Sequence, residues 1–197
     1  MGRQGRSRVA IEAVSPEIDA GRFPAKRSVG EKVAVEADIF ADGHDAVACV
    51  IRYRHEGESD WTEVPMLPLL NDRWRAEFVV TELGLYRITI EAWVDRLETW
   101  RRQLAKRVEA GQDVTQEQEV GARMVEAGAD RSLSVTYGRQ VEILVEPQRA
   151  RYGAWYEMFP RSAGKQGKHG TFRDVEDWLP YISGMGFDVL YFPPIHP

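Results

Sequence analysis

Hydrophobic and polar residues alternate over much of the first half of the chain, which predicts β-strands with one buried face. Val33, Val35 and Ile39 alternate with polar or small residues, and the alternation returns in residues 85–94. Residues 1–30 are rich in turn-forming residues, so we expect an extended arm or an irregular first strand there. Short strands separated by turns predict an antiparallel sandwich of immunoglobulin-like type. Its further strands are expected in residues 48–53, 61–66, 72–80 and 134–145, with a turn at Asn71-Asp72.

The period lengthens to three and four residues between positions 97 and 128, which predicts a pair of helices. The first helix carries an apolar stripe and ends at Gly111, and the second begins with Thr115 as its N-cap. This helical hairpin would be an insertion, residues 97–128, in a β-domain that spans residues 1–146. The stripe either packs on its own sandwich or meets the same stripe in a second subunit. Its residues are Leu97, Trp100, Leu104 and Val108.

Residues 147–197 have the pattern of a strand, a helix and a second strand. The strands are expected in residues 154–159 and 187–192, and a helix kinked at Pro180 starts at Thr171, three residues before Asp174. Parallel strands are normally covered on both faces, which a single βαβ unit cannot achieve. We therefore expect residues 147–197 to open a larger α/β domain, and the chain to be an N-terminal piece of a longer protein.

Composition narrows the function classes without naming one. The chain has 197 residues and a formal net charge of −5, which disfavours a protein that coats nucleic acid. It contains no run of about 20 apolar residues that would span a membrane. Its single cysteine, Cys49, can form neither an internal disulfide nor a thiolate metal cage, so a cytoplasmic protein is expected.

Few residues have the spacing of a reactive centre. The glycine- and lysine-rich loop of residues 164–171 lacks the P-loop pattern, and the histidines have no partners at metal-ligand spacing, so no metal site is expected. Glu157 and Asp188 lie on neighbouring predicted strands. Asp188 falls near the start of its strand, where a structural ion pair or hydrogen bond is the better account. Glu157 lies nearer the C-terminal end of its strand and is a candidate functional residue.

Several segments resemble one enzyme family. Residues 155–162 (WYEMFPRS), 169–172 (HGTF), 179–182 (LPYI), 185–191 (MGFDVLY) and 193–197 (PPIHP) resemble the maltosyltransferases that use α-maltose 1-phosphate, in glycoside hydrolase family 13 of the α-amylase superfamily. Residues 5–17 and 21–24 also resemble the N-terminal β-sandwich domain of that family. The resemblance covers nearly the whole chain.

The resemblance implies a bacterial, cytoplasmic enzyme that moves maltosyl from α-maltose 1-phosphate to the non-reducing end of an α-1,4-glucan, with release of phosphate and retention of configuration. The implied fold is the sandwich with its helical insertion, followed by the first βαβ unit of a TIM (β/α)8 barrel in residues 147–197. The catalytic Asp and Glu residues of the family come from later barrel strands, so no catalytic residue is assigned here and the chain alone is expected to be inert. No cofactor is implied.

The family also forms homodimers through its N-terminal domain and helical insertion, which makes Leu97, Trp100, Leu104 and Val108 the expected dimer interface. Glu157 and His196 lie near C-terminal strand ends and are expected to line the donor pocket. Two alternatives stay open. The chain could belong to another family 13 hydrolase or branching enzyme, or it could be a non-catalytic module for carbohydrate binding or dimerisation.

Overall fold

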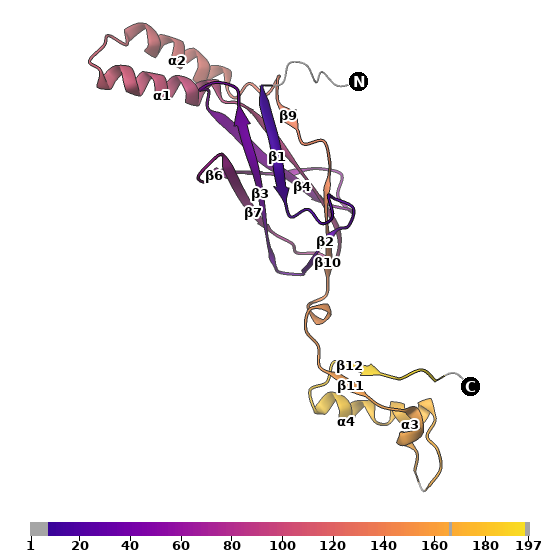
Figure 1. Cartoon of the computed structure of the whole chain (residues 1–197). Helices are drawn as coiled ribbons and strands as arrows, with labels where there is room; N and C mark the ends of the chain where they lie inside the picture. The colour runs from indigo at the N-terminus through magenta and orange to yellow at the C-terminus, as the bar shows by residue number, and fades with distance from the viewer. Residues whose placement is uncertain (1–7, 166, 196–197) are drawn as a thin grey trace. The chain divides into compact units, whose positions relative to one another are not determined.

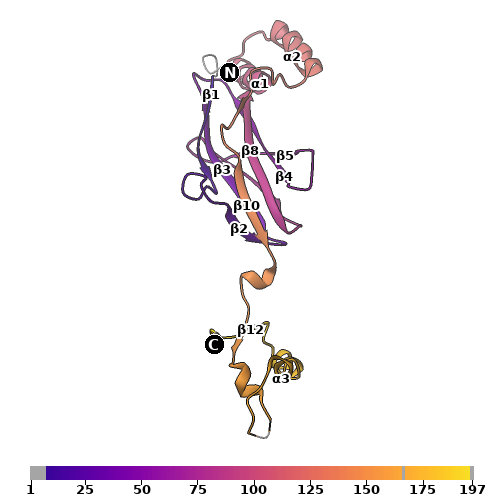
Figure 2. The ribbon, with the colours of Figure 1, turned by 90° about the vertical axis from the view of Figure 1, so that its right-hand side faces the viewer.

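The computed structural model describes residues 8–165 and 167–195, and the chain divides into two compact units with the boundary between Val145 and Glu146. The first unit contains two β-sheets (Figures 1 and 2). One sheet has the order β1-β3-β7-β6, and the other has the order β2-β10-β8-β4-β5, with β9 also paired to β8. The strands of the first sheet are β1 (Val9–Ser15), β3 (Lys32–Ala41), β7 (Arg73–Val79) and β6 (Leu67–Pro68). Those of the second are β2 (Ala25–Ser28), β10 (Val141–Glu146), β8 (Gly84–Val94), β4 (Val47–His55), β5 (Thr62–Pro65) and β9 (Val135–Thr136).

The two sheets share one hydrophobic core, as the alternating pattern predicts. In β3 every second side chain from Val33 to Ile39 is buried, and these side chains belong to the same cluster as Ile51 of β4 and Ile90 of β8. Removing this much apolar surface from water is the main force that holds the sheets together. Cys49 lies in this core, and burial raises the pKa of its thiol to about 12. The thiol therefore stays protonated, and Cys49 is a packing residue.

Two expectations for the first unit need correction. The sequence predicted an arm or a single irregular strand in residues 1–30. Residues 1–7 lie outside the described residues, and residues 8–30 supply β1 and β2, one to each sheet. The strand predicted over residues 134–145 is interrupted: β9 and β10 both pair with the same edge of β8, the Tyr137 amide still donates to the carbonyl oxygen of Ile90, and residues 138–140 lie outside the ladder. At the interruption, the side chain of Arg139 donates a hydrogen bond to the carbonyl oxygen of Ala20 at 2.8 Å.

The helical hairpin is present as predicted and consists of α1 (Arg96–Glu109) and α2 (Thr115–Ala127). The predicted N-cap is wrong: Val114 occupies that position, and the backbone N–H and hydroxyl of Thr115 both donate to Asp113. Trp100 joins the two helices, because its ring lies against Gly121 and its Nε1 donates to the carbonyl oxygen of Glu117 at 2.9 Å. A Cβ atom on Gly121 would overlap that ring, so glycine is required for the close approach.

The hairpin projects from the end of the sandwich at which β8 ends (Figures 1 and 2). α1, whose residues are all described, contains no buried residue. Two hydrogen bonds of 2.8 Å join its start to the sandwich: the Asp95 amide donates to the carbonyl oxygen of Ala46, and the Ala46 amide donates to the hydroxyl of Thr99. The stripe on α1 is therefore not buried against the sandwich of its own chain.

The second unit is a short parallel βα arrangement. β11 (Trp155–Glu157) pairs in parallel with β12 (Val189–Tyr191), and two short helices, α3 (Phe172–Glu176) and α4 (Leu179–Gly184), connect them. Short 3₁₀ turns cover Gln148–Ala150 and Pro160–Ala163. Its core contains Met158, Ala163, Val175 and Ile182. The described residues form a two-stranded sheet here, and the barrel itself stays a prediction.

The helix of the second unit is broken where the sequence predicted only a kink. Pro180 lies in the first turn of α4, where a missing backbone N–H leaves no helical hydrogen bond unmade. Thr171 and Asp174 form the predicted capping box at the start of α3. The amide and hydroxyl of Thr171 both donate to Asp174 at 2.7 Å, and these bonds, the backbone bond first, lower the pKa of that carboxyl. The capping box therefore begins α3, and Pro180 lies at the beginning of a second helix, α4.

Candidate functional site

Glu157 occupies an exposed face of the second unit, at the C-terminal end of β11. In the register of the parallel sheet it lies beside Tyr191. Tyr156 and Leu190 pack on the core of this unit, and side chains alternate along a strand, so Glu157 and Tyr191 belong to the opposite face. Trp155 shares that face: it is 61% exposed, and its ring centroid lies 6.2 Å from that of Tyr191. This face therefore presents a carboxylate and two aromatic rings, which can offer a ligand hydrogen-bond acceptors and apolar contact area. His196, the other predicted pocket residue, lies outside the described residues.

Asp188 has the structural role predicted for it and does not join Glu157. One carboxylate oxygen accepts a hydrogen bond from the Ala154 amide at 3.2 Å, and the other lies 3.7 Å from Nε of Arg149. Asp188 precedes β12, whereas Glu157 ends β11, so the two carboxylates lie at opposite ends of the two-stranded sheet. They are not arranged as a catalytic carboxylate pair.

The loop that follows β11 is closed at its base by two glycines. A Cβ atom on Gly170 would lie 2.5 Å from the Gly164 nitrogen, and the amide of Gly170 donates to the carbonyl oxygen of Arg161 at 3.0 Å. Lys165 pairs with Asp177 at 3.3 Å. Glu157 ends β11, the strand just before this loop. The contact between Gly164 and Gly170 therefore fixes the path of the backbone that follows Glu157.

The predicted dimer residues lie on α1 but differ in their surroundings. Leu97, Trp100 and Leu104 are half-buried, and Val108 is 55% exposed. Trp100 contacts α2 within the hairpin, as described above. The helices carry opposite charge: α1 has five basic and two acidic residues, whereas α2 has three acidic residues and one basic residue.

Comparison with known proteins decides the family. A model of domain N/S of α-1,4-glucan:maltose-1-phosphate maltosyltransferase matches residues 7–159. The chain belongs to this maltosyltransferase family. The matched residues include both sheets, the hairpin and β11, so the helical insertion belongs to the family domain.

Relatives from several bacteria carry the same name. The chain is similar to the maltosyltransferase of Chlorobaculum tepidum, with 40% identity over 237 aligned positions that cover 98% of this chain and 35% of the relative. That of Myxococcus xanthus is 41% identical, covering 96% of this chain and 36% of the relative. That of Pseudomonas aeruginosa is 34% identical, with 96% and 35% coverage. The chain thus spans about a third of the length of these maltosyltransferases.

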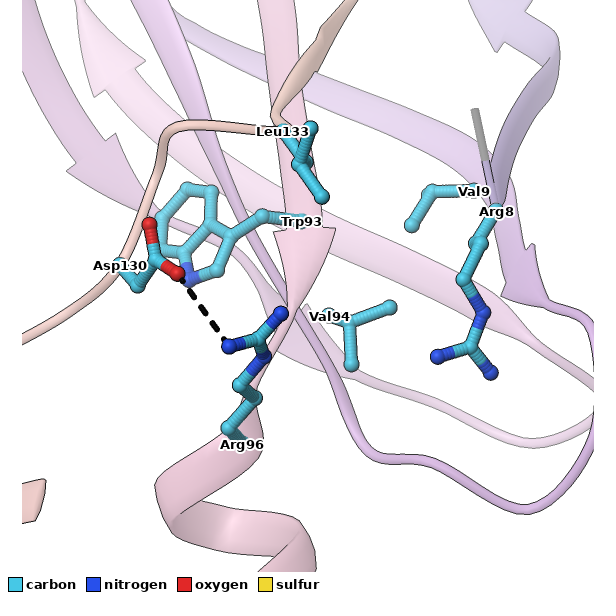
Figure 3. Close-up of a pocket in the computed structure, with 7 residues that line it drawn as sticks. All are labelled: Arg8, Val9, Trp93, Val94, Arg96, Asp130 and Leu133. Carbon is cyan, nitrogen blue, oxygen red and sulfur yellow. Dashed lines mark ion pairs between the residues drawn. The ribbon is translucent and has the colours of Figure 1, made fainter. Parts of the chain in front are cut away.

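Sequence reasoning missed a polar junction at the base of the hairpin (Figure 3). Arg96, at the start of α1, reaches Asp130 at 3.6 Å, close to the ring of Trp93. A hydrogen bond from the Ser132 side chain, and then one from its backbone, lower the pKa of Asp130. An adjoining cavity of about 210 Å³ is lined by Trp93, Leu97, Met124 and Ala127, among others. These residues come from two separate stretches of the chain, 93–97 and 124–132, so no local sequence pattern predicts the junction.

Neither a metal centre nor a membrane helix was found in the part of the chain that the structure describes. No group of three or more His, Cys, Asp or Glu residues there is placed to hold a metal ion. No helix among the same residues is long and apolar enough to cross a membrane.

Proposed function

We propose that this chain is the N-terminal portion of a cytoplasmic enzyme that moves maltosyl from α-maltose 1-phosphate to the non-reducing end of α-1,4-glucans and releases phosphate. The observation that carries the proposal is the family match over residues 7–159, together with relatives of that name at about 40% identity. Because the chain spans about a third of those relatives, the remainder of the enzyme would supply the reacting groups. The chain by itself would be inert.

The second unit would be the first βαβ unit of a TIM (β/α)8 barrel, and the first unit an immunoglobulin-like sandwich. Parallel pairing of β11 with β12 supports the barrel, because parallel strands belong to sheets that are covered or closed. The face with Trp155, Glu157 and Tyr191 lies away from α3 and α4, which is the side that a barrel turns inward. Glu157 and His196 would then line the donor pocket near C-terminal strand ends.

Retention of configuration defines what the later strands would contribute. A carboxylate would attack the anomeric carbon as the bond to phosphate breaks, and phosphate would leave with the bonding electrons. A glucan hydroxyl would then displace the carboxylate and give its proton to a second carboxylate that acts as general base. The two carboxylates would stand about 5–5.5 Å apart, as in retaining glycosidases.

The hairpin would join two copies of the enzyme. Both helices carry exposed valines, Val108 on α1 and Val120 and Val125 on different sides of α2, and the two helices carry opposite net charge. In a two-fold contact the same surfaces meet with their roles exchanged, so α1 of one copy can lie against α2 of the other. The apolar residues would be covered and the charges would complement each other.

The product of the full-length protein tests the proposed reaction. Incubated with α-maltose 1-phosphate and glycogen, the protein encoded by the complete reading frame is expected to release phosphate and to lengthen the glucan by maltosyl units. Nuclear magnetic resonance of the new linkage should show the α-configuration. Release of free maltose in place of the longer glucan would indicate a hydrolase, and rearrangement of glucan without any use of the phosphate ester would indicate a branching enzyme.

A further inference from the structure

The segment that leads from α2 back to the sandwich, residues 128–136, is attached to β8 by a short ladder. Only Val135 and Thr136 pair with β8, opposite Ala92 and Glu91. One residue beyond this segment, the Tyr137 amide donates to the carbonyl oxygen of Ile90 at 2.8 Å. Gly128, with φ of +71°, turns the chain out of α2. So short a strand has little backbone pairing of its own, and other contacts must hold the segment in place.

Arg131 supplies those contacts from the middle of the segment. Its guanidinium lies over the ring of Trp93, 4.2 Å from the ring centroid. The same group donates to both carboxylate oxygens of Glu63, at 2.9 and 3.2 Å. Trp93 belongs to β8 and Glu63 to β5, so one side chain ties the segment to two strands. We call the set of Arg131, Trp93 and Glu63 the latch.

The latch continues into a charged layer on the outer face of the sheet. Arg52 of β4 lies 3.4 Å from Glu63 and 3.5 Å from Glu91, and Glu91 is almost fully buried. Trp93 is buried to a similar degree. Glu91 and Trp93 both lie near the C-terminal end of β8, the strand with which residues 135 and 136 pair. If the segment left β8, a charged group and an indole ring would gain access to water.

The other attachment of the hairpin is of a different kind. There β8 runs directly into α1, and the hydrogen bonds of Asp95, Ala46 and Thr99 involve backbone groups and a hydroxyl. Salt screens ion pairs and leaves such neutral hydrogen bonds almost unchanged. Between the two attachments lies the cavity of about 210 Å³, bounded by Leu97 of α1 and Met124 of α2. The Arg96–Asp130 ion pair joins the segment to the start of α1. Apart from that pair, one attachment of the hairpin rests on neutral hydrogen bonds and the other on Arg131, with the cavity between them.

We propose that Arg131 is a switchable latch that sets the direction in which the helical hairpin points. When Arg131 leaves Trp93 and Glu63, residues 128–136 separate from β8 and the hairpin turns about its junction at Asp95. High ionic strength, or an acidic group that competes for Arg131, favours the open state. The proposal does not depend on what the hairpin binds.

Amide hydrogen exchange in the Arg131→Ala variant of the 197-residue chain tests the latch. The Tyr137 amide is expected to exchange about tenfold faster than in the unmodified chain, because an ion pair and a cation–π contact are lost together. Amides of β10 should keep their rates, because β10 has its own ladder with β8. Arg123→Ala, which removes a guanidinium from the exposed surface of α2, is the matched control and should leave Tyr137 unchanged.

Two further measurements make the test decisive. Added salt should speed exchange at Tyr137 in the unmodified chain and have little effect in Arg131→Ala. The double variant Arg131→Ala/Glu63→Gln should lower the free energy of opening at the Tyr137 amide by less than the sum of the decreases in the two single variants. Unchanged exchange at Tyr137 in Arg131→Ala would overturn the proposal. Equal acceleration at Tyr137 and throughout β10 would also overturn it, because that result indicates loss of global stability in place of local opening.

Discussion

Val108→Glu is expected to convert the dimer of the full-length protein into a monomer. The proposed interface covers Val108, which is 55% exposed on α1 of the single chain. A carboxylate buried at that position would lie without a partner in an apolar contact, and its loss of hydration should weaken association at least about 100-fold. Light scattering coupled to size-exclusion chromatography measures the mass directly.

Gln103→Glu is the matched control, because it adds the same charge to α1 on a different side of the helix. Residues 103 and 108 are separated by about 140° around the helix axis, and Gln103 is also exposed. This variant should remain dimeric, and circular dichroism should show equal helix content in both proteins. A dimer that survives Val108→Glu at the same concentration contradicts the proposed interface.

Gly164→Ala is expected to unfold the second unit and leave the first intact. The added Cβ atom would meet the carbonyl oxygen of Lys168 and lie 2.6 Å from the Gly170 nitrogen. Both are backbone atoms, so no side chain can rotate away from the clash. The core of this unit includes only a few buried side chains, and a cost of roughly 3 kcal/mol or more from overpacking would exceed what they can offset.

Hydrogen exchange resolves the two units separately in this variant. Amides of α3, α4 and β12 should lose protection, and those of β3 and β8 should keep it. Gly184→Ala is the control in the same unit, because a Cβ atom there has nothing within 4 Å. Retained protection of β12 in Gly164→Ala would show that the loop base tolerates a methyl group and that the glycine pair is not required.

Local patterns predicted most elements of this fold because each depends on nearby residues. The alternation through β3 selects one buried face whatever the partner strand is, and the capping box of Thr171 and Asp174 needs only four residues. Features that depend on distant residues were missed. At the interruption between β9 and β10, Arg139 contacts the carbonyl group of Ala20, which is far away in the sequence, and the N-cap of α2 depends on how the loop before it folds.

The candidate site was predictable only in part, for the same reason. The spacing in residues 154–159 places Glu157 near a strand end, and the structure adds its neighbours Trp155 and Tyr191 on one exposed face. The latch had no local signal, because Glu63, Trp93 and Arg131 come from three separate parts of the chain. The proposed catalytic carboxylates have no candidates among these residues and belong to the proposed remainder of the enzyme.

The most direct test of the account compares phosphate release by two proteins under identical conditions. The 197-residue chain and the protein from the complete reading frame are each incubated with α-maltose 1-phosphate and glycogen. The account predicts steady release by the complete protein and none above background by the chain, which would provide only the scaffold and the first barrel strands. Release by the chain at the rate of the complete protein would contradict it, because the reacting groups would then lie within these 197 residues.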